Sequence, residues 1–314
     1  KVGFKMDQEY LVNNYIKQGD QAYDNGNMIK CLNYYLMAEE LLNGVKDLDL
    51  IINIALVLDE MGESENAEKK YKEALGINEF DSRAHYGLGV IYDERENFTQ
   101  AIEHYKKAIE INPVYDRALF YLANDLDIIG EKEEAIIYYE KLLEICSKDF
   151  WAHINLGSIY EELNVLDKAY RRFSKAVEID PNHYMALFNM AVIYKKLNVL
   201  DKSKVYYERA IEKNLGYPYS FLNLAIIYKD EGKIDKAIEI LSRGIKFNPD
   251  CEFLFYNRSC FNALKGEIGC AIDDLIKAVE LYPKFIDYIK KDKELEMVRE
   301  SLKFKEYVKS NYGL

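Results

Sequence analysis

Residues 150–183, FWAHINLGSIYEELNVLDKAYRRFSKAVEIDPNH, show the pattern that decides the fold. The small residue Ala169 recurs along the chain at a strict spacing of 34 residues. Its counterparts elsewhere are also small: Ala67, Ala101, Ala135, Ser203, Ala237 and Ala271. Cys31 takes the same place two residues out of step, which predicts a two-residue insertion near residues 46–47. Most of the chain is therefore one short motif repeated many times.

Each repeat is expected to contain two helices. In residues 82–115 apolar side chains fall at Leu88, Ile91 and Tyr92, and again at Ala101 and Tyr105, with the spacing of one helix face. Most repeats separate the two helices by a residue that tolerates the left-handed conformation: Gly26, Gly62, Gly130, Asn164, Asn198, Gly232 and Gly266. Proline follows the second helix of several repeats and stops it. The pattern predicts a helix, a tight turn and a helix in each repeat.

This pattern resembles the tetratricopeptide repeat (TPR), whose signature combines small, aromatic and proline residues at set positions. Residues 150–183 match that signature at His153, Leu156, Gly157, Tyr160, Ala169, Phe173, Ala176 and Pro181. Eight repeats fit the register: 12–45, 48–81, 82–115, 116–149, 150–183, 184–217, 218–251 and 252–285. The first is the weakest, with Ala22 at position 11 and Cys31 at position 20.

The resemblance implies an all-α fold, a right-handed TPR superhelix (α-solenoid) of eight helix-turn-helix repeats, and a bacterial member of the family is expected. Small residues let the helices approach closely, while large residues fill the space between repeats. One repeat cannot bury its own apolar face, so the end of the stack needs a cap. We expect residues 1–11 to form an N-terminal lead-in and residues 286–314 a C-terminal capping helix.

The composition argues against several classes of function. Lys and Arg number 42 against 54 Asp and Glu, and the net charge of −12 repels phosphate backbones, so we expect no nucleic-acid partner. No apolar run is long enough for a membrane span. The five cysteines lack the spacing of a zinc site, so we expect free thiols in a reducing, cytoplasmic setting, with no metal and no cofactor.

No arrangement of catalytic residues is visible in the sequence. His85 and His153 take position 4, where the signature has a large packing residue, and His104 and His183 fall on a helix surface and in a loop. No phosphate-binding loop or nucleophile motif accompanies them. We therefore expect a protein that is not an enzyme.

Function is then expected on the surface that the repeats share. In the TPR family the first helices of successive repeats line a concave groove, and position 6 faces it. Asparagine recurs at this position, as Asn53, Asn155, Asn189, Asn223 and Asn257. Asparagine is a mediocre helix former. The row is either a ladder of amides that binds the backbone of an extended peptide, as in the similar TPR domain of the O-linked N-acetylglucosamine transferase, or a structural or consensus feature.

Two further surfaces accompany the asparagines. Apolar residues at positions 2 and 5 are expected either to bind a partner or to be buried within the superhelix: Trp151, Ile154, Phe188, Tyr219, Leu222, Phe253 and Tyr256. Acidic residues at positions 12 and 13 form an acidic ridge: Asp59, Glu60, Asp93, Glu94, Asp127, Glu161 and Glu162. This ridge is either a solvated helix face or a contact surface for a basic portion of the partner, which added salt would weaken.

Two hypotheses of function follow from these surfaces. In the first, the protein is an interaction scaffold whose groove binds an extended segment of a partner protein through the asparagine ladder and apolar pockets. In the alternative, it is the substrate-recruiting TPR region of a larger enzyme whose catalytic domain lies outside this chain. A catalytic domain adjoining these repeats would favour the second. The pattern predicts no particular oligomeric state.

Overall fold

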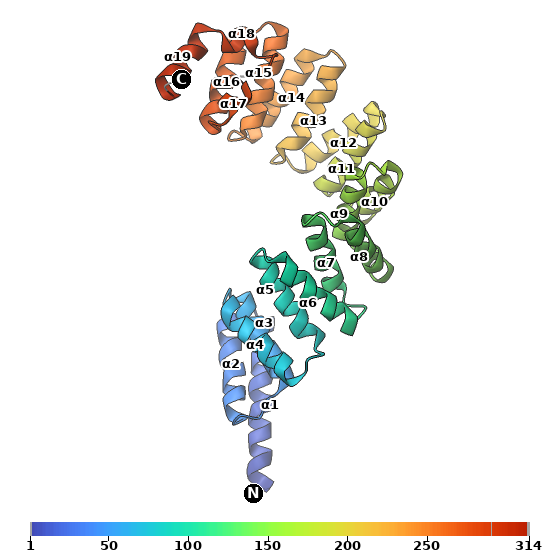
Figure 1. Cartoon of the computed structure of the whole chain (residues 1–314), viewed down its shortest axis with the longest axis vertical. Coiled ribbons are helices and arrows are strands. Elements are labelled where there is room, and N and C mark those ends of the chain that lie inside the picture. The colour runs from blue at the N-terminus through green and yellow to red at the C-terminus, as the bar shows by residue number, and fades with distance from the viewer. Residues whose placement is uncertain (1, 290, 313–314) are drawn as a thin grey trace. The chain divides into compact units, whose positions relative to one another are not determined.

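The computed structural model describes the backbone of residues 2–289 and 291–312, with side chains from residue 8 onward. Every regular element in these residues is a helix, and the helices follow one another in pairs (Figure 1). The first eight are α1 (Val2–Asp24), α2 (Met28–Leu41), α3 (Leu48–Glu60), α4 (Ser64–Ile77), α5 (Ser82–Glu94), α6 (Phe98–Ile111), α7 (Asp116–Ile128) and α8 (Lys132–Ile145). The next eight are α9 (Phe150–Glu162), α10 (Leu166–Ile179), α11 (Tyr184–Lys196), α12 (Leu200–Lys213), α13 (Pro218–Asp230), α14 (Ile234–Phe247), α15 (Glu252–Lys265) and α16 (Ile268–Leu281). The predicted all-α solenoid of helix pairs is confirmed.

The turn within each repeat is made by a residue with positive φ. The predicted glycines and asparagines all adopt this conformation: Gly26, Gly62, Gly130, Asn164, Asn198, Gly232 and Gly266. In the third repeat Glu96 takes the same place, with a φ of 57°. The turn therefore forms even where the residue is not one that favours the left-handed region.

Aromatic residues at position 24 fill the space between the helices in the first six repeats, and leucine takes this position in the last two. Tyr105, Tyr139, Phe173 and Tyr207 are almost completely buried. A Cβ added to Gly157 would lie 2.6 Å from Cε1 of Phe173, closer than real side chains approach. A glycine at this position therefore lets the first helix lie directly on the ring of the second, as the signature implies.

The chain forms two compact units, residues 1–155 and residues 156–314, which we call the N-terminal and C-terminal units. In the N-terminal unit α1 packs on α2, α3 on α4, α5 on α6 and α7 on α8. In the C-terminal unit α11 packs on α12, α13 on α14 and α15 on α16. Helix α9 begins in the first unit and ends in the second. None of the described helices is long and apolar enough to cross a membrane.

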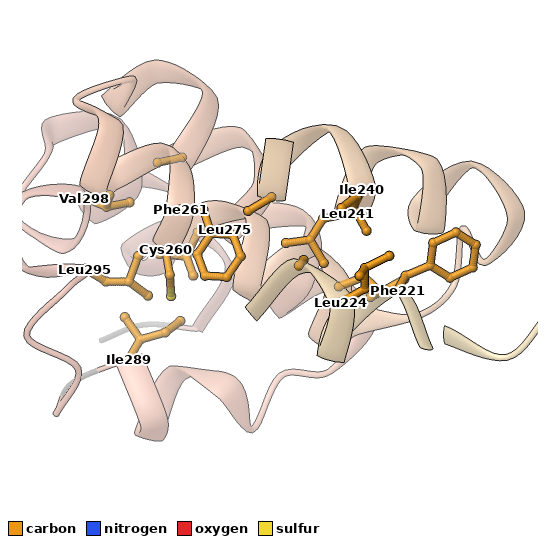
Figure 2. Close-up of a cluster of buried hydrophobic side chains, with 14 of the residues drawn as sticks. Phe221, Leu224, Ile240, Leu241, Cys260, Phe261, Leu275, Ile289, Leu295 and Val298 are labelled. Carbon is orange, nitrogen blue, oxygen red and sulfur yellow. The ribbon is translucent and has the colours of Figure 1, made fainter. Parts of the chain in front are cut away.

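The segment after the last repeat is helical, but it consists of three short helices where the sequence predicted one capping helix. They are α17 (Phe285–Ile289), α18 (Glu296–Arg299) and α19 (Leu302–Tyr312). Charged residues at 291–294 interrupt the apolar periodicity, and Oδ1 of Asp292 accepts a hydrogen bond from the backbone N–H of Glu294 at 2.9 Å, which holds a turn. Ile289, Leu295 and Val298 nevertheless join the buried core of the preceding repeats, and Figure 2 shows Ile289 and Leu295 pointing toward Cys260.

The predicted lead-in also differs from the structure. Helix α1 begins at Val2 and continues without interruption to Asp24, so residues 2–11 extend the first repeat helix. No proline occurs in this stretch to stop the helix. Residue 1 of the lead-in and residues 290, 313 and 314 of the capping segment lie outside the described residues.

Candidate functional site

Position 6 of one repeat faces the aromatic residue at position 24 of the preceding repeat. In the N-terminal unit Nδ2 of Asn155 donates a hydrogen bond to Oη of Tyr139 at 3.0 Å. Where glycine takes this position, at Gly87, an added Cβ would lie 2.2 Å from the ring of Tyr71. Asn155 thus satisfies a buried tyrosine hydroxyl, which is the structural role that the sequence left open for the row.

The asparagines of the C-terminal unit have more hydrogen-bonding capacity to offer. For Asn189, the residue at position 24 of the preceding repeat is Phe173, which has no hydroxyl. The Asn189 amide makes no hydrogen bond to any described residue. Nδ2 of Asn223 donates to the carbonyl of Tyr219 at 3.0 Å, and Nδ2 of Asn257 donates to the carbonyl of Phe253 at 2.7 Å. Each of these two bonds uses one N–H and leaves the amide oxygen and the other hydrogen.

Asn53 stands apart from this group in the N-terminal unit. It lies on α3 and is partly buried. The position-24 residue before it is Tyr35, whose hydroxyl already donates to Oδ1 of Asp20 at 2.7 Å. Asn53 is therefore not required as a partner for that tyrosine.

Two aromatic side chains of the predicted apolar surface are stacked on each other. The ring centroids of Tyr219, on α13, and Phe253, on α15, are 4.9 Å apart and nearly parallel. Tyr219 is 48% exposed. Phe188 and Leu222 are partly buried and pack against the core of the C-terminal unit. This part of the predicted surface therefore contains both exposed apolar side chains and apolar side chains that pack against the core.

Two other members of the predicted apolar surface have structural roles. Ile154 is only 3% exposed, so it takes the buried role that the sequence left open for this row. The hydroxyl of Tyr256 donates to Oδ2 of Asp292, and its ring stacks on Phe285 at 4.9 Å. Tyr256 thus ties the last repeat to the capping segment. Trp151, in the N-terminal unit, is 46% exposed and meets Phe150 edge to face.

The acidic ridge is not one uniform solvated face. In the N-terminal unit Oδ1 of Asp59 is buried without a hydrogen-bond partner in the described residues, and burial, with the charges of Glu94 and Glu60, raises the pKa of Asp59 to about 6. Burial also raises the pKa of Asp93. Glu60 accepts a hydrogen bond from the hydroxyl of Tyr23.

The remaining ridge residues differ from these in their pairing. In the N-terminal unit Oδ1 of Asp127 lies 3.5 Å from Nζ of Lys132. In the C-terminal unit Glu161 is paired with Lys196, and Glu162 is exposed. The charges that the sequence places in one row therefore divide into paired, half-buried and exposed groups.

Sequence reasoning missed a buried carboxyl group on α7. Asp125 has no exposed surface, and neither carboxylate oxygen has a hydrogen-bond partner among the described residues. Burial and the charge of Asp93 raise the pKa of Asp125 to about 7. A signal was present, because position 10 is apolar in most other repeats: Val57, Ile91, Ile159, Ile193, Ile227 and Phe261.

The sequence also did not predict that two histidines would meet. Nδ1 of His85 and Nδ1 of His104 are 3.1 Å apart, and Nε2 of His85 lies 3.1 Å from the carbonyl of Glu79. A carbonyl only accepts, so Nε2 of His85 donates and its Nδ1 accepts from His104. Burial lowers the pKa of both rings, that of His104 to about 4. The packing role predicted for His85 holds, but His104 is not a freely solvated surface residue.

His153 resembles His85 in its contacts. It is 3% exposed, and its Nε2 lies 3.1 Å from the carbonyl of Ser147, six residues earlier, as Nε2 of His85 does from Glu79. Both residues at position 4 therefore bind the loop that precedes their helix. Within the described residues no group of three or more His, Cys, Asp or Glu side chains is arranged to hold a metal ion.

Comparison with known families and structures places this geometry in context. Family models described as tetratricopeptide repeat match residues 82–115 and residues 48–81, 117–149, 152–183, 186–213 and 218–251, more than half of the chain. The first and eighth repeats of our register have no such match, although both form helix pairs. No curated protein matches the sequence.

Several solved structures share the fold at low sequence identity. The C-terminal part of a TPR repeat-containing protein from Cytophaga hutchinsonii is 18% identical, with a TM-score of 0.63, 76% of this chain covered and 97% of the other. YrrB, described as a TPR protein with an unusual peptide-binding site, is 24% identical, with a TM-score of 0.54 over 59% of this chain and 95% of its own. The Cut9–Hcn1 hetero-tetramer of the APC/C gives 16% identity and a TM-score of 0.56 over 95% of this chain and 59% of the matched chain. These likenesses show the fold, and the matched repeats support a protein-interaction scaffold.

Proposed function

Since this chain belongs to the tetratricopeptide repeat family, we propose that it is a non-catalytic scaffold that binds an extended segment of a partner protein. The binding face that we propose is made by the first helices of three repeats in the C-terminal unit, α11, α13 and α15. One similar protein, YrrB, is described as having a peptide-binding site.

The observation that favours this face most is the stacked pair of Tyr219 and Phe253. Tyr219 remains 48% exposed although its neighbours on α13, Phe221 and Leu224, are completely buried. Exposed aromatic groups that rest on a packed core offer contact area at a low cost in side-chain entropy. A partner side chain that covers the pair would add about 1.5–3 kcal/mol of apolar burial.

The asparagines supply polar groups on the same three helices. Asn189 has an unused amide, and Asn223 and Asn257 each retain an acceptor oxygen and one N–H. An extended peptide presents backbone carbonyls and amides that pair with such groups. Three net hydrogen bonds would contribute about 1.5–4.5 kcal/mol, which at best matches the smallest cost of association, about 4 kcal/mol. The aromatic pair is therefore needed as well, and binding would tolerate many partner sequences.

A display library of extended peptides, selected on the whole protein, tests this function. We expect selected peptides to lose affinity for a variant with Asn189→Ala and Tyr219→Ala, which removes one unused amide and one exposed ring. Val205→Ala is the control, because Val205 is 58% exposed but lies on the second helix of its repeat, α12. If no peptide is enriched, or if the double variant binds as well as the control does, the proposed face is wrong.

A further inference from the structure

An aromatic pocket lies in the N-terminal unit, whereas the proposed peptide face belongs to the C-terminal unit. Its volume is about 270 Å³, and its walls come from α5, α7 and the start of α9. Four aromatic residues, two aspartates and one arginine line it: Tyr86, Phe120, Tyr121, Trp151, Asp116, Asp149 and Arg117. We call it the aromatic pocket. This volume lies just below the range of about 300–1,000 Å³ that is typical of small-ligand pockets.

The aromatic walls are held by ring contacts with one another and with the core. Phe120 meets Tyr121 edge to face at 5.6 Å, and it meets the buried Tyr139 edge to face at 5.9 Å. Tyr86 lies 6.3 Å from Tyr121 between ring centroids. Trp151 and Tyr121 remain 46% and 37% exposed. The walls are thus anchored on one side and accessible on the other.

The two carboxylates of the pocket are fixed in place by backbone hydrogen bonds. Oδ1 of Asp149 accepts from the N–H of Ala152 at 2.8 Å and caps α9, while Oδ1 of Asp116 accepts from the N–H of Arg117 at 2.7 Å. Two acids and one base give the lining a formal charge of −1. Burial raises the pKa of the Tyr86 hydroxyl, and the charge of the nearby Arg117 opposes that rise.

We propose that the aromatic pocket binds the ammonium group of a lysine or N-methylated lysine side chain of a partner. The faces of aromatic rings attract cations, and carboxylates at the same site balance the positive charge of the ammonium group. The two carboxylates would repel an anion, and an uncharged apolar group would gain nothing from their charge. Only the source of the cation rests on the proposed function; the pocket's preference for a cation can be measured with small molecules.

The protein contains a built-in probe of this pocket, because Trp151 is its only tryptophan. We would titrate the whole chain with choline, a quaternary ammonium ion, and follow tryptophan fluorescence while potassium chloride holds the ionic strength constant. The neutral isostere 3,3-dimethylbutan-1-ol has the same shape without the charge. Choline is expected to give a saturable change and to bind about tenfold more tightly than the alcohol. Equal binding of the two, or no saturable response to choline, would overturn the proposal.

Two variants separate the pocket's charge from its shape. Asp149→Asn removes the charge but keeps a helix N-cap, because asparagine caps as well as aspartate, and we expect it to weaken choline binding several-fold. Tyr121→Leu removes one aromatic face and should do the same. Asp81→Asn is the matched control, because Asp81 caps α5 at the corresponding position but does not line the pocket. Helical circular dichroism checks that each variant is folded. If Asp149→Asn and Asp81→Asn bind choline alike, the carboxylate has no role and the proposal fails.

The same titrations distinguish this inference from the proposed function. If the protein shows no selectivity for choline but still binds peptides on α11, α13 and α15, the cation site is refuted and the proposed function stands. If the protein binds choline but enriches no peptide, the proposed peptide-binding face is refuted and the pocket stands as a cation site. Trimethyllysine and lysine peptides then rank the degree of methylation, with trimethyllysine expected to bind more tightly since its charge is more easily desolvated.

Discussion

Replacing Asp125 is expected to stabilise the protein, and to do so more at alkaline than at acidic pH. Asp125 occupies an apolar position of the repeat, is completely buried, and has two carboxylate oxygens without a hydrogen-bond partner among the described residues. Burial, with the charge of Asp93 added, raises its pKa to about 7. In the unfolded chain an aspartate titrates near 3.9. The folded state therefore holds its proton at a pH where the unfolded state has already lost it.

The sign and size of the effect follow from this difference in pKa. Below about pH 4 the carboxyl is neutral in both states and imposes no electrostatic cost. As the pH rises from about 4 to about 7, folding requires either proton uptake or burial of a charge, so the cost grows and then stays constant. A difference of about three pKa units corresponds to about 4 kcal/mol, an upper limit because part of the shift comes from Asp93, which titrates together with Asp125.

The assay is urea unfolding, followed by helical circular dichroism, of the native protein and Asp125→Asn at about pH 5.5 and about pH 8.5. Asparagine matches aspartate in shape but does not titrate. The cost of burying its unpaired amide is therefore the same at both pH values. We expect the stability gained by Asp125→Asn to be larger at the higher pH by about 2 kcal/mol. Asp125→Ile, which restores the residue type found at Ile91 and Ile159, should gain more at both pH values.

An exposed aspartate provides the control for this experiment. Asp167→Asn, on α10, changes the same charge at an exposed position and should show no comparable dependence on pH. If Asp125→Asn changes stability by the same amount at both pH values, the buried carboxyl does not carry the cost assigned to it. A loss of stability on Asp125→Ile would show instead that the carboxylate has a partner that the fold requires.

Three other predictions concern binding, packing and pH. Asn189→Ala with Asn223→Ala should weaken peptide binding roughly 10–100-fold with little change in stability; normal binding with early unfolding in urea would show that these amides are structural. Gly157→Ala should lower the free energy of unfolding by about 1–3 kcal/mol, because the added Cβ would overlap the ring of Phe173. Gly76→Ala should raise it by about 0.5–1 kcal/mol, because no atom lies within 4 Å of the added Cβ. Equal effects of the two substitutions in thermal melts would refute the close-packing argument. Burial and the neighbouring histidine lower the pKa of His104 to about 4, below the unfolded value of about 6.5, so stability should fall as the pH drops from about 6.5 to about 4, and His104→Gln should lose less over that range.

Much of the fold could be predicted from the sequence, because the features that define it are local. The spacing of Ala169 and its counterparts sets the register, and the glycines and asparagines between helices adopt the left-handed conformation expected of them. Helix periodicity, turn residues and caps each depend on side chains a few positions apart, so a single sequence contains them in full. The capping segment departs from the prediction because it lies outside the repeat, where no register constrains where the helices break.

The candidate sites depended on the tertiary structure, because a side chain's role is decided by what the neighbouring repeat places opposite it. Asn155 meets the hydroxyl of Tyr139 and is used internally, whereas Asn189 follows a phenylalanine and has an unused amide, although both occupy position 6. Ile154 and Tyr219 belong to the same predicted apolar row, yet one is buried and the other is half exposed. The aromatic pocket gathers residues from three helices that are distant in sequence. The sequence alone determined which residues share a repeat position, and only the packing of helix on helix decided which of those side chains are buried or already hydrogen-bonded, since burial and hydrogen-bond pairing are properties of contacts between repeats.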